Sequence, residues 1–122
     1  MGLRSQFTVV DDVLIVRLDG EIDHHEAKNL RVDWQFVFQD SECRHVVVNM
    51  NGVSFMDSSG IGVILGRFKE VEQVGGTLVV CCLHEHVRQI FNMSGLYKII
   101  HVAGSEEDAF TYLGVDPSCK MK

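Results

Sequence analysis

The sequence predicts an α/β fold, a single domain in which helices pack against a mixed β-sheet. Short β-branched segments alternate along the chain with longer segments whose apolar residues recur every three or four positions. This alternation is typical of helices that connect neighbouring strands of one sheet. A length of 122 residues suits one domain with its own hydrophobic core. We therefore expect the element order ββαβαβαβα over residues 1–114 and a frayed C-terminal tail at residues 115–122.

The N-terminal segment predicts a β-hairpin. Residues 7–10 and 13–18 are rich in β-branched and large apolar side chains, and Asp11 and Asp12 form a polar turn between them. We expect Gly20 to end the second strand.

A helix and a central strand follow the hairpin. The helix is expected at residues 26–39, because one face carries the apolar residues Ala27, Leu30, Trp34, Val37 and Phe38. Asp23 is placed to cap its N-terminus. Residues 45–50 form a nearly continuous β-branched run without polar alternation. Such a run predicts a central strand that is covered on both faces.

Two serines follow this strand, at the start of a second helix. The helical period runs over residues 61–74, and Gly75 and Gly76 are expected to end the helix. Ser58 and Ser59 lie where the strand ends and the helix begins. We expect one hydroxyl to cap the helix and the other to face solvent or a partner.

Four further elements complete the predicted fold. Residues 77–83 indicate a buried strand, and the apolar pattern that follows indicates a short helix closing near Gly95. Residues 99–102 indicate an edge strand. Acidic residues at 105–108 precede a final helix, whose N-terminus they would stabilise.

Composition argues against several classes of partner. The chain carries 17 acidic and 11 basic residues, a formal charge of -6. This charge opposes binding to nucleic acid or to an anionic membrane, and it favours a basic partner surface.

No apolar run approaches the roughly 18 to 20 residues of a membrane span. The first residues lack the apolar segment of a secretory signal, so we expect a soluble cytoplasmic protein. Its cysteines, expected to be reduced, show no CxxC spacing: Cys43, Cys81, Cys82 and Cys119.

The serines and the nearby glycines raise two enzymatic alternatives. Neither Ser58 nor Ser59 lies in a GxSxG motif, but six histidines leave a spatial catalytic triad open. Gly60, Gly62 and Gly66 are spaced GxGxxxG, which differs from the dinucleotide-binding GxGxxG, and the lysine of a phosphate-binding loop is missing. A small serine hydrolase or a nucleotide-binding protein is the alternative function. We predict instead that no residue is catalytic and that no cofactor binds.

Simpler roles account for the remaining glycines and histidines. We expect Gly62 and Gly66, one helical turn apart, to let the helix approach a neighbouring element closely. The histidine-rich segments 24–26 and 84–86 lack the spacing of a zinc site, so no metal is predicted. Glu21, Asp23 and His24 lie at the end of a strand, where they could either cap and form a turn or contact a partner.

Three separated segments resemble one known family. Residues 20–25, residues 56–67 with the sequence MDSSGIGVILGR, and residues 93–100 with the sequence MSGLYKII occur in the order seen in anti-sigma-factor antagonists of the STAS domain family. The resemblance extends from about residue 7 to residue 114. It is strongest to the sporulation antagonists of endospore-forming bacteria.

The resemblance implies a phosphorylation-switched interaction module. The unphosphorylated form would bind an anti-sigma factor that is also a serine kinase, and so release a sigma factor for sporulation-specific transcription. The kinase would phosphorylate Ser58 and block binding, and a serine phosphatase would reverse the modification. We expect a monomer. A STAS-type module in another kinase–phosphatase assembly is the alternative. The predicted partner-binding residues are Glu21, Asp23, His24, Asp57, Ser59, Gly60 and Ile61.

Overall fold

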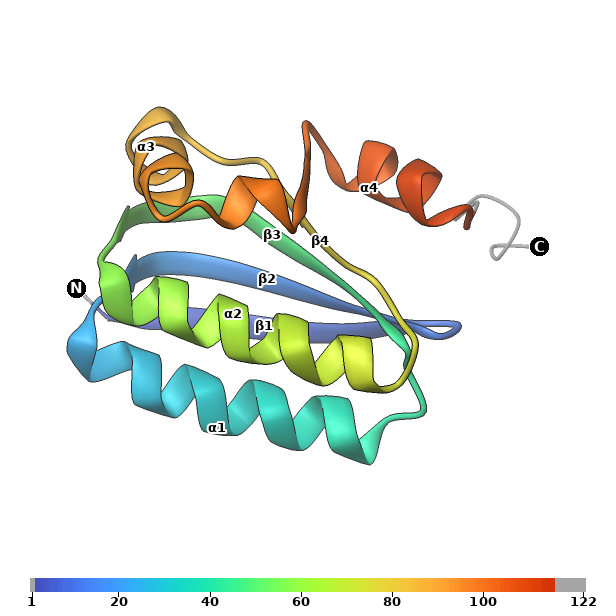
Figure 1. Cartoon of the computed structure of the whole chain (residues 1–122). Helices are drawn as coiled ribbons and strands as arrows, with labels where there is room; N and C mark the ends of the chain where they lie inside the picture. Colours follow the sequence, from blue (N-terminus) through green and yellow to red (C-terminus); the bar gives the residue numbers. More distant parts are fainter. Residues whose placement is uncertain (1, 116–122) are drawn as a thin grey trace.

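The chain folds into one five-stranded sheet with helices on both faces (Figure 1). The computed structural model describes residues 2–115, so most of the predicted C-terminal tail, from residue 116 onward, lies outside the described residues. The predicted order ββαβαβαβα is confirmed, with one short 3-10 helix added. The elements are β1 (Leu3–Val10), β2 (Val13–Ile22), α1 (His24–Asp40), β3 (His45–Met56), α2 (Ser58–Gln73), β4 (Leu78–Cys81), α3 (Glu85–Met93), η1 (Leu96–Lys98), β5 (His101–Ala103) and α4 (Glu106–Leu113).

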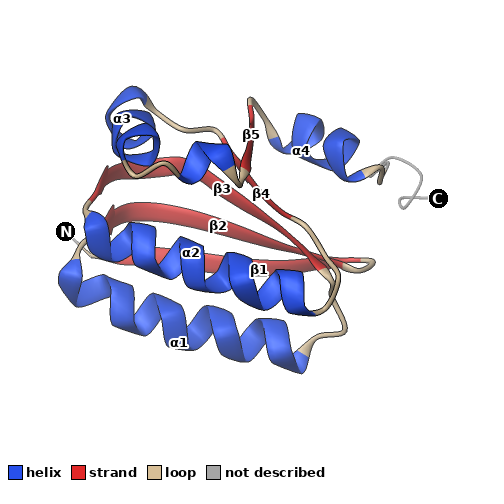
Figure 2. Cartoon of the chain, in the orientation of Figure 1, coloured by secondary structure: helices blue, strands red, loops and turns tan. Residues whose placement is uncertain are grey.

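Strand order decides which face each helix covers. The strands lie in sequence order, with β1 antiparallel to β2 and every other neighbouring pair parallel. Crossovers between parallel strands are almost always right-handed, so three crossovers that advance in one direction place α1, α2 and α3 on one face. Figure 2 shows α1 and α2 side by side across that face. α4 follows the last strand and packs on the opposite face.

Alternate residues of the central strands fill two separate cores. Leu14 and Val16 of β2 point toward α1 and α2, whereas Val13 and Ile15 of the same strand point toward α4. This period of two is the geometry of a β-strand. Residues 46–48 of β3 are completely buried, which confirms the predicted central strand.

Gly20 does not end the second strand, because β2 continues through it to Ile22. The backbone of Gly20 has φ +126, and a Cβ at this position would collide with the carbonyl oxygen of Gly2. That carbonyl accepts a hydrogen bond from the N–H of Glu21 at 3.1 Å. The glycine therefore lets β1 pass close to an irregular step in β2, where the prediction placed a strand end.

The predicted edge strand is correct in kind but begins two residues later. Ile99 and Ile100 both donate their backbone N–H groups to the carbonyl of Leu96, so they close η1 and do not pair with β4. β5 starts at His101. Gly95, in the left-handed conformation with φ +82, separates α3 from η1, as expected for a helix-ending glycine.

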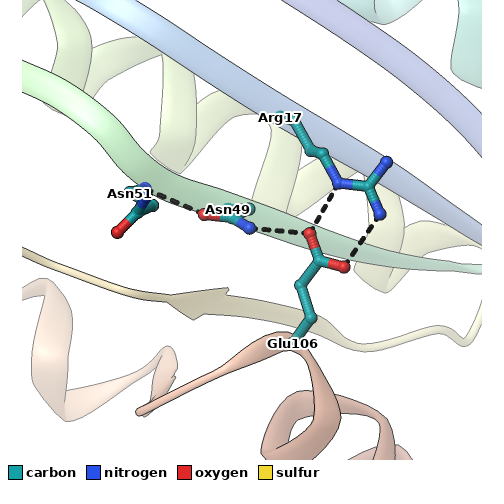
Figure 3. Close-up of polar contacts among 4 residues, drawn as sticks. All are labelled: Arg17, Asn49, Asn51 and Glu106. Atoms are coloured by element: carbon teal, nitrogen blue, oxygen red, sulfur yellow. Dashed lines mark hydrogen bonds and ion pairs between the residues drawn. The ribbon is translucent and has the colours of Figure 1, made fainter.

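A polar network ties α4 to the sheet (Figure 3). Arg17 donates to both carboxylate oxygens of Glu106, at 2.7 and 2.9 Å, and Asn49 Nδ2 donates to Glu106 Oε2 at 2.7 Å. Asn49 Oδ1 in turn accepts the backbone N–H of Asn51 at 2.8 Å. These donors, Arg17 foremost, lower the pKa of Glu106 below its ordinary value, although partial burial opposes the shift.

Candidate functional site

The ends of β2 and β3 bring two predicted site segments to the same edge of the sheet. Ile22 and Met56, the last residues of these parallel strands, lie opposite each other in the sheet. The N–H of Asp57 donates to the carbonyl of Ile22 at 3.3 Å. The chain therefore leaves the sheet at neighbouring points, once into α1 after Asp23 and once into α2 after Asp57.

Asp57 caps α2, which corrects the expectation that a serine hydroxyl would do so. Its Oδ1 accepts the backbone N–H of Ser59 at 2.8 Å, and its carbonyl oxygen accepts the N–H of Gly60 at 3.0 Å. Asp57 has the extended backbone typical of an N-cap residue. Ser58 is thereby the first helical residue. The aspartate one position earlier therefore takes the N-cap position itself, and its carboxylate binds an N–H group of the first turn.

Both serine hydroxyls are left without a hydrogen-bond partner within residues 2–115. Ser58 is exposed and Ser59 is half-buried. Ser59 and His24 line the same groove. No described histidine is hydrogen-bonded to either hydroxyl, as a base-activated nucleophile requires. The arrangement offers a free hydroxyl at the surface, which suits a group that is modified by another protein.

The second segment begins with a matching cap. Asp23 Oδ1 accepts the backbone N–H groups of His25 and Glu26, each at 3.0 Å, which confirms the predicted cap of α1. His24 is exposed, whereas Glu21 and Asp23 are half-buried. The capping role of Asp23 leaves its second carboxylate oxygen outside these two bonds.

The remaining predicted contact residues, Gly60 and Ile61, are less accessible. Gly60 is buried, and a Cβ on it would meet the side chains of Met56 and Ile22. Ile61 is half-buried and packs against the main core. Partner contact by these two residues stays a prediction, but the structure gives Gly60 a clear packing role at the point where α2 leaves the sheet.

Gly62 and Gly66 do not serve the close packing that their spacing predicts. A Cβ on either residue would find no atom within 4 Å outside the helix's own nearby backbone. The interpretation was wrong because spacing along a helix does not reveal which face meets a neighbour. The glycine in close contact is Gly60, two residues before Gly62.

A groove of about 260 Å³ runs between the first turns of α1 and α2. It brings the predicted residues His24 and Ser59 together. Sequence reasoning missed two of its basic residues, Lys28 and Arg31, although their spacing from His24, four and seven positions, places all three on one helical face. Its lining residues are His24, Ala27, Lys28 and Arg31 of α1 and Ser59, Gly62 and Val63 of α2.

A larger hollow of about 490 Å³ lies on the sheet surface beside the polar network of Figure 3. Its two arginines already have partners, because Arg4 pairs with Asp19 at 2.9 Å and Arg17 pairs with Glu106. Size alone therefore does not make this hollow the better candidate. The edge that carries Ser58 combines a hydroxyl that has no hydrogen-bond partner within residues 2–115 with two cations, Lys28 and Arg31, that form no ion pair in the same range.

Other kinds of site find little support in the described part of the chain. Within residues 2–115, no group of three His, Cys, Asp or Glu side chains is placed to hold a metal ion. No helix in the same range has the length and apolar content of a membrane span. Cys43, Cys81 and Cys82 are free thiols, and burial raises the pKa of Cys43 and of Cys81.

Comparison with known proteins agrees with this fold. The chain is 45% identical over 115 residues to an anti-sigma F factor antagonist of Paenibacillus polymyxa, a match that covers 94% of this chain and 98% of that protein. It is similar to the solved structure of the anti-sigma factor antagonist SpoIIAA in its unphosphorylated form, with a TM-score of 0.79, 32% identity, and coverage of 92% of this chain and 98% of that one.

The structure of the Bacillus cell fate determinant SpoIIAA in its phosphorylated form is also similar, with a TM-score of 0.67, 32% identity, and coverage of 85% of this chain and 95% of that one. The first two of these relatives are anti-sigma factor antagonists, which are regulatory proteins. The sequence model of the STAS domain matches residues 4–109. The match spans most of the chain and agrees with the architecture described above, so the chain belongs to the STAS domain family.

Proposed function

We propose that this chain is an anti-sigma-factor antagonist that is switched by phosphorylation of Ser58. The observation that carries the proposal is the exposed, unbonded hydroxyl of Ser58 at the first turn of α2, beside the edge that holds Glu21, Asp23 and His24. Relatives that are anti-sigma-factor antagonists support it. In the unphosphorylated form, the chain binds an anti-sigma factor that is also a serine kinase, and the sigma factor is released.

Phosphorylation blocks this binding through charge. A phosphate adds about -1.5 to -2 charges at neutral pH, and on Ser58 it would lie next to the carboxylate of Asp57 in the contact surface. Docking would then have to bury or approach an uncompensated cluster of negative charge, which costs free energy. Each loss of about 1.4 kcal/mol weakens binding tenfold.

The fold itself need not change on phosphorylation. A negative group at the start of a helix is stabilised by roughly 0.3 to 1 kcal/mol, because it interacts with the free N–H groups of the first turn. The existence of SpoIIAA structures in both unphosphorylated and phosphorylated forms is consistent with a domain that folds in either state. A serine phosphatase returns the protein to its binding form, and the cycle controls sporulation-specific transcription in the cytoplasm.

The experiment combines phosphorylation with binding. Purified chain is incubated with the anti-sigma kinase encoded in the same organism and ATP, and mass spectrometry is expected to find one phosphate, on Ser58. Calorimetry is expected to show that Ser58→Ala binds the kinase but is not switched off, and that Ser58→Asp binds at least tenfold more weakly. Far-ultraviolet circular dichroism should show both variants folded.

Ser59→Ala is the matched control, because it removes the neighbouring hydroxyl without removing the proposed acceptor. It is expected to be phosphorylated like the wild type. Phosphate on Ser59, or no phosphate on either serine, would contradict the assignment. Phosphorylation by a different kinase, captured by a pull-down with no anti-sigma factor present, would favour a STAS module of another signalling assembly.

A further inference from the structure

The groove between α1 and α2 contains positive charge that the described residues do not neutralise. Neither Lys28 nor Arg31 forms an ion pair within residues 2–115, and both side chains belong to exposed residues. Four other arginines of this part of the chain each contact a carboxylate: Arg4 with Asp19, Arg17 with Glu106, Arg44 with Asp12 and Arg67 with Glu70. Lys69, Arg88 and Lys98 also form no ion pair with a carboxylate within residues 2–115, but only Lys28 and Arg31 share one groove.

No acidic side chain lines this groove. The residues on the α1 side are His24, Ala27, Lys28 and Arg31, spaced along about two turns of one helical face. Asp23 lies next to the groove in sequence, but it caps the N–H groups of His25 and Glu26. The positive charge is therefore available to a group from outside the chain.

The α2 side of the groove is open because of Gly62. This residue lines the groove, and a Cβ there would meet nothing within 4 Å. Glycine within a helix lowers stability relative to alanine, so its presence here is not explained by the helix itself. Val63 and Ala27, both buried, supply apolar surface at the base of the groove. The open space, the apolar base and the two cations together suit a short side chain that has methylene groups and a carboxylate at its end.

We propose that this groove receives an acidic side chain, glutamate or aspartate, from the anti-sigma partner. The carboxylate would lie between Lys28 and Arg31, and its methylene groups would contact Val63 and Ala27. This inference rests on the function proposed above and adds the chemistry of one contact. The rest of the chain is acidic and therefore suits a basic partner surface around this contact. Because the charges at the groove are opposite to those around it, the contact would also help to set the orientation of the complex.

The test uses three variants of the full chain and the purified anti-sigma kinase that phosphorylates Ser58. Lys28→Gln/Arg31→Gln removes the two cations, and Gly62→Leu fills the groove without changing charge. Each is expected to weaken binding of the unphosphorylated chain at least tenfold by calorimetry. The double variant is also expected to show a shallower dependence of affinity on salt, because fewer charge pairs form in the complex.

Arg44→Gln/Lys69→Gln is the matched control, since it removes the same two charges from residues that do not line the groove. Its affinity should stay within about twofold of the wild type, after circular dichroism has shown that all variants are folded. Equal losses in the control and the groove variant would overturn the proposal, because net charge alone would then explain both.

Two other results separate this inference from the proposed function. If the groove variants bind as tightly as the wild type and are still phosphorylated on Ser58, the groove contact is wrong and the switch stands. If the wild type itself does not bind the kinase, both fail. If the double variant binds normally when unphosphorylated but changes only the affinity of the phosphorylated form, the groove holds the phosphate of Ser58 and the partner contact is overturned.

Discussion

At the scale of single residues, Asp57 decides which atoms remain free at the start of α2. Because its carboxylate accepts the N–H of Ser59, neither serine hydroxyl is needed as a cap. Ser58 keeps an exposed hydroxyl at the first helical position. A side chain that capped the helix would have to give up its bond before a kinase could modify it, so the aspartate cap makes Ser58 available without cost to the helix.

Glu106 gives a prediction about pH. Its pKa in the folded protein is lowered by hydrogen bonds from Arg17 and Asn49, so the charged carboxylate stabilises the fold at neutral pH. This stabilisation is present above the ordinary value of 4.5 and is lost as the pH falls through the lowered pKa. Glu106→Gln should reduce the free energy of unfolding by about 1 kcal/mol at neutral pH, a value kept small because Arg17 is partly exposed.

Urea unfolding followed by the fluorescence of the buried Trp34 measures this difference. The gap between wild type and variant should close as the pH drops below about 4, because the wild-type carboxyl is then protonated as well. Asp19→Asn is the control: its ion pair with Arg4 is well exposed and should contribute little. A gap for Glu106→Gln that is independent of pH would contradict the role of the charge.

At the scale of elements, α2 contains glycines with opposite environments. Gly66 has open space where a Cβ would lie, whereas a Cβ on Gly60 would collide with the side chains of Met56 and Ile22. The same substitution should therefore act in opposite directions at the two positions. The helical period of the sequence locates this helix, but the period alone does not distinguish the two glycines.

Gly66→Ala should raise the free energy of unfolding by about 0.5 to 1 kcal/mol, because alanine restricts the unfolded chain and favours the helix. Gly60→Ala should lower it by about 1 to 3 kcal/mol, because the added methyl overfills a packed site. Thermal and urea unfolding of the two variants measure both values. Two changes of the same sign would show that the environment of one glycine is misassigned.

At the scale of the whole molecule, the two faces of the sheet are covered unequally. Three helices and one continuous core cover one face, whereas α4, with eight residues, covers part of the other. The centre of the molecule is the pair β2 and β3, where residues 13–16 and 46–48 are buried almost completely. Stability is expected to fall from this centre toward α4.

Hydrogen exchange measured by mass spectrometry tests this gradient. Amides of β2 and β3 should exchange most slowly, and those of α4 markedly faster, because few buried side chains hold α4 in place. Glu106→Gln should speed exchange in α4 and leave β3 unchanged, since it removes the ion pair that joins α4 to Arg17. Equal acceleration in both elements would mean that α4 unfolds only together with the sheet.

The sequence by itself determined the class of fold, the order of its elements, the cap at Asp23 and the position of the serines at the start of α2, just after β3. These features depend on local pattern, because periodicity, turn residues and caps act over a few neighbouring positions. Local pattern also explains the errors. A glycine after a β-branched segment is typical of a strand end, and only the pairing with β1 shows that β2 continues through Gly20. A serine before a helix is typical of a cap, and only the structure shows that Asp57 takes this role.

Only the tertiary structure decided which residues from different elements meet. The parallel pairing of β2 with β3 places Asp23 and His24 beside Asp57 and Ser58, although more than 30 positions separate them. The packing of α1 against α2 then forms the groove with its unpaired cations. Such contacts depend on strand order and on which face each helix covers, and these are properties of the whole sheet that no short segment encodes.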